Sequence, residues 1–241
     1  QLAALTTAQL AKMETDDIAA ITTAQITALT TAQIAALTTA QAVAISEDQV
    51  AVLKTAQLAA LTTANFVEMS TDQLAAITTA QISALTTAQV SALTEDQAVS
   101  LSEDQVAALK TAQVAALSTA NLAAMSEDQV AALTTAQVTA LTTAQIVALT
   151  EDQVAAMGTA QLAALTTAQL AKMETDDIAA ITTDQITALK TAQMEALTTA
   201  QVVALSEDQV ATLTTAQLAA LTTAQLAKME TDDIAAITTA Q

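Results

Sequence analysis

The sequence has no Cys, His, Trp, Tyr or Pro, and it contains one Gly and one Phe among 241 residues. Without Cys and His there are no disulfides, no thiol chemistry, no zinc sites of the usual kind and no imidazole-based catalytic triad. Polar residues interrupt every apolar run after roughly four positions, so no segment is long enough to cross a bilayer. We therefore expect a protein that is not an enzyme, with no catalytic residues, no cofactor and no metal site.

Positive charge is also scarce. Six Lys are set against 25 Asp and Glu, which gives a formal net charge of −19. Nucleic-acid binding needs basic patches and usually aromatic platforms, so the composition predicts no nucleic-acid partner. No phosphate-binding loop or nucleophile motif is present, and we expect no small-molecule substrate.

An eight-residue repeat fills the chain from Thr6 onward without an insertion, as in TTAQLAKM, ETDDIAAI and TTAQITAL. Positions one and two are mostly Thr, Ser or Glu, position four is usually Gln, positions six and seven are mostly Ala, and positions five and eight are aliphatic. Residues 46–77 closely match residues 102–133, which indicates duplication of whole groups of blocks. We expect residues 1–241 to form one continuous octapeptide array, cut from a longer repeat protein.

An eight-residue period fits neither a long helix nor a strand well. Eight residues advance an α-helix by about 800°, so the apolar stripe of a single helix would turn by roughly 80° per block. In a β-solenoid the buried residues keep one parity, whereas positions five and eight have opposite parity. Thr and Val keep the strand alternative open, but the pattern favours one short helix in every block.

The first four positions of each block resemble a helix start. Ser/Thr-x-x-Gln is a capping box, and the apolar residues at position eight of the previous block and position five form a hydrophobic staple around it. Six blocks also place Glu and Asp in the first helical turn, where the helix dipole favours negative charge. These acidic pairs are Glu47/Asp48, Glu95/Asp96, Glu103/Asp104, Glu127/Asp128, Glu151/Asp152 and Glu207/Asp208.

Seven blocks lack a hydroxyl at position one but carry Thr at position two. Their first residues are Lys54, Lys110, Lys190, Glu14, Glu174, Glu230 and Gly158. A helix cap contributes about 1 kcal/mol. We interpret the Thr at position two as a replacement cap that compensates for the missing hydroxyl.

The predicted fold is an all-α superhelical solenoid of short capped helices, one per eight-residue repeat. Each helix is expected to span positions two to eight, which is too short to be stable alone. Positions five and eight share one face, and Ala at positions six and seven permits close helix packing. Stacked blocks then form a continuous aliphatic core held by nearest-neighbour contacts.

The Gln at position four is the most regular polar residue. Only Asn65, Asn121, Asp17, Asp177 and Asp233 replace it. The favoured interpretation is the capping box together with hydrogen bonds between stacked coils. The alternative is an exposed Thr or Gln ladder that binds ice, a mineral or a glycan.

The acidic ETDD segments are the densest groups of carboxylates. They contain Glu14/Asp16/Asp17, Glu174/Asp176/Asp177 and Glu230/Asp232/Asp233. Calcium takes six to eight oxygen ligands, but no calcium-loop motif or turn glycine is present, so a specific site is not expected.

Ion pairs are the simpler expectation for the lysines. Lys12, Lys172 and Lys228 precede Asp16, Asp176 and Asp232 by four residues, the spacing of an ion pair on a helix surface. Lys54, Lys110 and Lys190 follow Asp48, Asp104 and Asp184 by six residues, and a bend in the chain could pair them.

The pattern LTTAQ-[ILV]-x-A-L-[ST]-x-x-Q resembles the Thr/Ala/Gln-rich octapeptide tracts of large bacterial secreted or cell-surface proteins, over the whole chain. The resemblance implies a stalk, an adhesin shaft or an extracellular filament, located outside the cell or on its surface. The implied partners are further copies of the chain. A scaffold that binds other proteins remains an alternative, although the exposed positions vary little.

Overall fold

The computed structural model describes residues 2–239 and 241, and over these residues it contains one short 3₁₀-helix, 29 α-helices and no strand. The prediction of an all-α fold with one helix per block is therefore confirmed, and the β-solenoid alternative is wrong. The helices group into two compact units, Gln1–Met125 and Ser126–Gln241.

The first unit consists of η1 and fifteen α-helices. Their bounds are η1 Leu2–Ala4, α1 Thr7–Leu10, α2 Thr15–Ala20, α3 Thr23–Ile26, α4 Thr31–Ala35, α5 Thr39–Val43, α6 Glu47–Val52, α7 Thr55–Leu58, α8 Thr63–Val67, α9 Thr71–Ala75, α10 Thr79–Ile82, α11 Thr87–Ser91, α12 Glu95–Val99, α13 Glu103–Ala108, α14 Thr111–Val114 and α15 Thr119–Ala124.

The second unit has the same organisation. Its helices are α16 Glu127–Ala131, α17 Thr135–Ala140, α18 Thr143–Val147, α19 Glu151–Ala156, α20 Thr159–Ala164, α21 Thr167–Leu170, α22 Thr175–Ala180, α23 Thr183–Ala188, α24 Thr191–Ala196, α25 Thr199–Val203, α26 Glu207–Thr212, α27 Thr215–Ala220, α28 Thr223–Leu226 and α29 Thr231–Ala236.

Every α-helix among the described residues starts at position two of its block, as predicted, but it ends between positions five and seven. The prediction that the helix reaches position eight is wrong. After α6, for example, the N–H of Leu53 donates to the carbonyl oxygen of Val50 at 3.1 Å, and the Leu53 backbone turns out of the helix with ψ 138°. The next residue, Lys54, is also extended, with ψ 149°. Two consecutive extended residues thus make the corner between α6 and α7.

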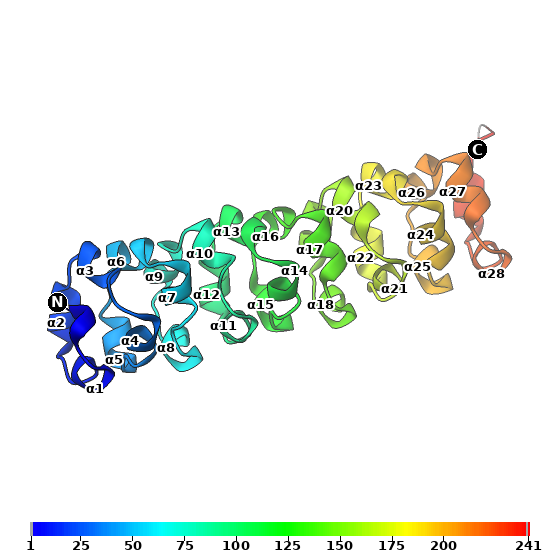
Figure 1. Cartoon of the computed structure of the whole chain (residues 1–241). Helices are drawn as coiled ribbons and strands as arrows, with labels where there is room; N and C mark the ends of the chain where they lie inside the picture. Colours follow the sequence, from blue (N-terminus) through cyan, green and yellow to red (C-terminus); the bar gives the residue numbers. More distant parts are fainter. Residues whose placement is uncertain (1, 240) are drawn as a thin grey trace. The chain divides into compact units, whose positions relative to one another are not determined.

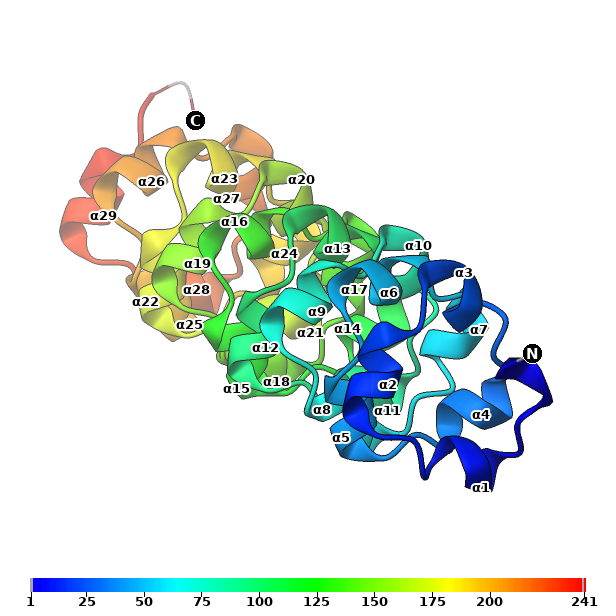
Figure 2. The ribbon, with the colours of Figure 1, turned by 90° about the vertical axis from the view of Figure 1, so that its left-hand side faces the viewer.

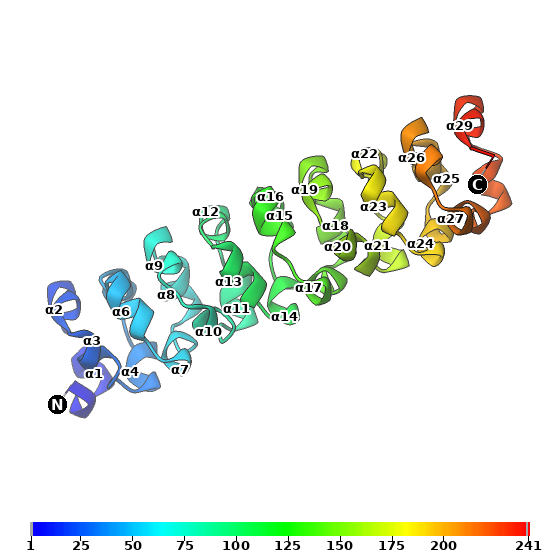
Figure 3. The ribbon, with the colours of Figure 1, turned by 90° about the horizontal axis from the view of Figure 1, so that it is seen from above.

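Helices three blocks apart pack on each other, so each coil of the solenoid contains three blocks, or 24 residues. In the first unit α3, α6 and α9 follow one another along one edge (Figure 1). In the second unit α16, α19 and α22 form an equivalent row (Figure 3). The coil therefore has three helical sides, a number that the eight-residue period alone does not specify.

The core is formed by positions five and eight, as predicted. Position-five side chains from Leu10 to Val210 are fully buried, and position-eight side chains from Ile21 to Leu221 are nearly so. Because helices of four to six residues are unstable in isolation, this aliphatic contact with the coils on either side stabilises them.

Candidate functional site

The capping box occurs in the structure as the sequence predicts. In the block that contains α10, the Thr78 hydroxyl accepts the N–H of Gln81 at 3.3 Å. The Gln81 side-chain oxygen accepts the N–H of Thr78 at 2.7 Å. Two backbone N–H groups that the helix itself leaves unpaired are thus satisfied by side chains.

The proposed compensation by Thr at position two is wrong. At Lys54 the helix still begins at Thr55, and no side-chain cap bond forms. Instead, the N–H of Gln57 donates to the Lys54 carbonyl oxygen at 2.9 Å. The Gln57 side chain still accepts the Lys54 N–H at 2.8 Å. Gly158 lacks a cap in the same way. At Lys54 and Gly158 the backbone carbonyl of position one thus accepts the N–H of position four.

Replacing Thr134 by Val is expected to lower the free energy of unfolding by about 1 kcal/mol, because the Thr134 hydroxyl accepts the N–H of Gln137 at 3.3 Å. Thr135 is exposed and provides no cap, so Thr135→Val is expected to change the stability by less than about 0.5 kcal/mol. Urea denaturation followed by circular dichroism measures both. A neutral Thr134→Val, with a loss of about 1 kcal/mol only when Thr135 is also replaced by Val, would restore the compensation hypothesis.

The amide nitrogen of the same Gln joins one coil to the previous one. Gln81 Nε2 donates to the carbonyl oxygens of Val50 at 2.8 Å and Leu53 at 2.7 Å. In the second unit Gln201 Nε2 donates to Leu170 and Met173 at 2.8 Å each. We call this set of position-four side chains and the carbonyl groups that they reach the amide seam.

The amide seam confirms the favoured interpretation of the repeated Gln. Position-four side chains are buried from Gln33 to Gln225, so they do not form the exposed Gln ladder that surface binding requires. As at Gln81, the buried Gln amide uses its oxygen within its own block and its nitrogen between coils. The Asn65 oxygen differs, because it accepts the hydroxyl of Thr39 at 3.2 Å. A buried polar group must be paired in this way, because an unpaired one costs about 1–3 kcal/mol.

Asn at position four is shorter and reaches a single carbonyl group. Asn65 Nδ2 donates to Leu37 at 2.7 Å and Asn121 Nδ2 donates to Leu93 at 2.9 Å. Both Asn residues lie on helices, α8 and α15, that pack on the only two blocks with Ala at position five, namely those of Ala42 and Ala98. This pairing of unusual residues one coil apart was a signal of the 24-residue coil that the sequence analysis missed.

Asp177 occupies a seam position with an acidic side chain. It is 3% exposed, and its carboxylate accepts the N–H of Glu174 at 3.1 Å. The pKa of Asp177 is raised from 3.8 to about 6. Burial is the largest cause, the bond from Glu174 N–H opposes it, and the negative charges of Glu174, Glu151 and Asp176 add to the rise. At neutral pH Asp177 is therefore a buried carboxylate of the seam that is mostly ionised.

The other two ETDD segments differ from each other. Asp233 is also buried, and it accepts the N–H of Glu230 at 3.1 Å. Asp17 makes the same local contact with Glu14 at 3.2 Å but is exposed. Within residues 2–239 and 241, no group of three or more carboxylates is placed to hold a metal ion.

The expected ion pairs do not form among the described residues. Lys12 lies in the turn after α1, whereas Asp16 lies on α2, so the four-residue spacing does not place them on one helix. Lys172/Asp176 and Lys228/Asp232 are separated in the same way. Lys54, Lys110 and Lys190 are N-cap residues, and they make no pair with Asp48, Asp104 and Asp184. The exposed lysines remain in solvent, where an ion pair contributes little.

The coil places acidic first turns on top of one another in the second unit. α16, α19 and α22 pack in succession (Figure 2), and each starts with two exposed carboxylates. These are Glu127/Asp128, Glu151/Asp152 and Glu174/Asp176. Stacking at 24-residue intervals therefore produces a column of negative charge.

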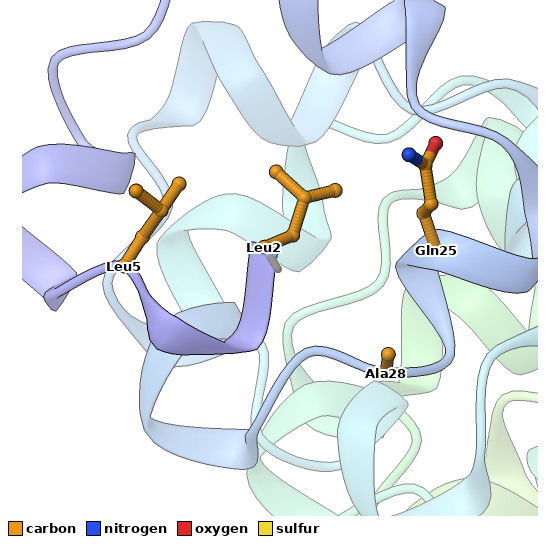
Figure 4. A pocket seen from close by; sticks show the side chains of 4 residues that line it. All are labelled: Leu2, Leu5, Gln25 and Ala28. Atoms are coloured by element: carbon orange, nitrogen blue, oxygen red, sulfur yellow. The ribbon is translucent and has the colours of Figure 1, made fainter.

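Two hollows in the surface differ in the polarity of the side chains that line them. One is lined by Leu2, Leu5, Gln25 and Ala28 (Figure 4). Another is lined by Val203, Leu205, Ser206, Glu207, Asp208, Glu230 and Asp233. The first has no ionisable group. In the second, Ser206 caps α26 by accepting the N–H of Gln209, so its hydroxyl has a structural role.

The described part of the chain contains no helix long and apolar enough to span a membrane.

No curated protein matches the sequence. The ALTTAQ repeat family matches seven stretches, most of them overlapping, that together cover well over half of the chain. These are residues 10–47, 50–87, 66–103, 102–135, 131–159, 154–191 and 178–215. With its capped helices and its amide seam repeated from coil to coil, this chain belongs to the ALTTAQ repeat family.

Proposed function

We propose that this chain is a structural segment of a stalk, fibre or filament on the outside of a bacterial cell, and that it is not an enzyme. The observation that carries the proposal is the amide seam. Its acceptors are backbone carbonyl groups, which every block provides, so any coil can stack on any other regardless of most side-chain changes. Coils added by duplication extend such an array without a new interface.

The surface chemistry supports the same role. Positions one to three are mostly exposed and carry mainly Thr, Ser, Ala, Glu or Asp. The net charge of −19 favours solubility of a long array. The absence of Cys makes folding independent of the redox state of the compartment. These features suit export and assembly outside the cell.

The test is electron microscopy of the purified chain beside a tandem duplication of it, with circular dichroism on both samples. We expect helical spectra, and narrow particles whose length increases in proportion to the number of coils. Particles that join end to end into fibres would support a filament, and separate particles would support a stalk. Particles whose longest dimension does not increase with duplication would contradict both.

The proposed location of the chain outside the cell needs a separate experiment. We expect an epitope tag placed in the chain to be accessible to antibody and to added protease on intact cells of the bacterium that encodes it. A tag that becomes accessible only after lysis would refute the extracellular part of the proposal and favour the alternative of an intracellular scaffold.

A further inference from the structure

The amide seam requires a donor at position four, and two different side chains meet this requirement. Gln reaches two carbonyl groups, at positions 31 and 28 residues before it, as Gln81 does. Asn reaches only the one at 28 residues, as Asn65 does with Leu37. The carbonyl group at 28 residues is therefore the acceptor common to both.

Asp177 has the shape of Asn but donates a hydrogen bond only when its carboxyl is protonated. It is buried at the seam, and its helix α22 packs on α19. By the register of the other blocks, the carbonyl group 28 residues before it belongs to Leu149. The ionised side chain accepts a hydrogen bond from Glu174 N–H and offers nothing to this carbonyl group.

We propose that Asp177 is an acid-responsive latch between two coils: protonated, it donates to the Leu149 carbonyl group and closes the seam as Asn does, and ionised, it leaves the seam one donor short. This device goes beyond the proposed structural role, since it makes the contact between adjacent coils depend on pH.

The charged side chains that act on the pKa of Asp177 all raise it. Glu174 and Asp176 lie on its own segment, and Glu151 and Asp152 lie at the start of α19. On its other side α22 packs on α25, and Thr199–Val203 has no titratable side chain. The groups that act on the pKa of Asp177 include no lysine. The negative neighbours favour the neutral form of Asp177, which is the form that donates.

The direction of the pH effect follows from linkage. The pKa of Asp177 is about 6 in the folded chain, compared with 3.8 for an unperturbed side chain. Between these two values the folded state binds more protons than the unfolded state, so its stability rises as the pH falls. The gain begins near pH 6 and is complete below the unfolded pKa, and above about pH 7 the latch is open.

Asp177→Asn keeps the shape of the side chain and provides a permanent donor, and Asp176→Asn is its matched control. Asp176 is exposed and adjacent, so the control removes the same charge without touching the seam. We expect Asp177→Asn to raise the urea midpoint at pH 7.5 above that of the unmodified chain and the control. We also expect it to reduce the rise in midpoint between pH 7.5 and 4.5, whereas Asp176→Asn retains this rise.

Carboxyl ¹³C NMR of a chain labelled at Asp provides a local measurement that does not depend on unfolding. The resonance absent from Asp177→Asn belongs to Asp177, and we expect it to titrate near pH 6. Equal urea behaviour of the two variants would show that general charge repulsion, and not the latch, sets the pH dependence. A titration midpoint near 4 would also refute the latch. Because Asn occurs at two seam positions of this chain, the variant is expected to fold.

Discussion

Replacing Gln81 by Glu is expected to lower the free energy of unfolding by roughly 3–5 kcal/mol, because it places an uncompensated buried charge in the amide seam. Gln81 is 3% exposed, and its Nε2 donates to Val50 and Leu53. Glu retains the capping half, since its carboxylate can still accept the N–H of Thr78, but it meets two carbonyl oxygens without a proton to donate. Urea denaturation at pH 7.5 measures the loss.

Two further variants separate the effect of the buried charge from the effects of the unpaired carbonyl groups and of the cap contact. Gln81→Met has a similar shape without charge or donors, and we expect a smaller loss of about 1–3 kcal/mol from the unpaired carbonyl groups. Gln25 makes the same cap contact with Thr22 at 2.8 Å but is exposed. Gln25→Glu is therefore expected to change the stability by less than about 0.5 kcal/mol. If Gln81→Glu were no more harmful than Gln25→Glu, the seam would contribute little to the packing of coils.

Replacing Phe66 by Ala is expected to lower the free energy of unfolding by about 3–5 kcal/mol, since it removes a large, fully buried side chain and leaves a cavity. Phe66 is 0% exposed and is the only aromatic residue of the chain. Its helix α8 packs on α5, where position five is the small Ala42. A large side chain above a small one keeps the core filled. Urea denaturation monitored by circular dichroism at 222 nm measures the effect.

Phe66→Leu is the matched control, because Leu occupies position five in many other blocks. We expect it to cost no more than about 1.5 kcal/mol. Combining Phe66→Leu with Ala42→Val is expected to recover part of this loss, provided that the two side chains share one layer of the core. Additive effects of the two changes would show that they pack independently.

The local structure of each block follows from its own sequence. The capping box at Thr78 and Gln81, the acidic first turn at Glu47 and Asp48, and the burial of positions five and eight all appear where the eight-residue pattern predicts them. These features depend on residues within about four positions of one another, and their energies do not depend on where the rest of the chain lies. The expectation that the chain has no catalytic residues also follows from local sequence patterns, and it remains a prediction.

Other features were decided by the tertiary structure. The end of six-residue helices such as α6 comes from two extended residues at the corner, here Leu53 and Lys54. The three-block coil comes from the way successive corners close around a shared core. Lys12 and Asp16 illustrate the difference, because their spacing predicts a pair and the corner between them separates them.

The two roles of the position-four side chain depend on the local sequence and on the packing of the coils. The sequence determined that Gln caps its own helix, because the cap is a contact between residues three apart. The stacking of the coils determines that the same amide is buried and donates to carbonyl groups 28 and 31 residues away. It also determines that Asp177 is a buried acid at a seam position. A contact between distant residues depends on the number of blocks per coil, which is set by the packing of whole helices and not by any one repeat.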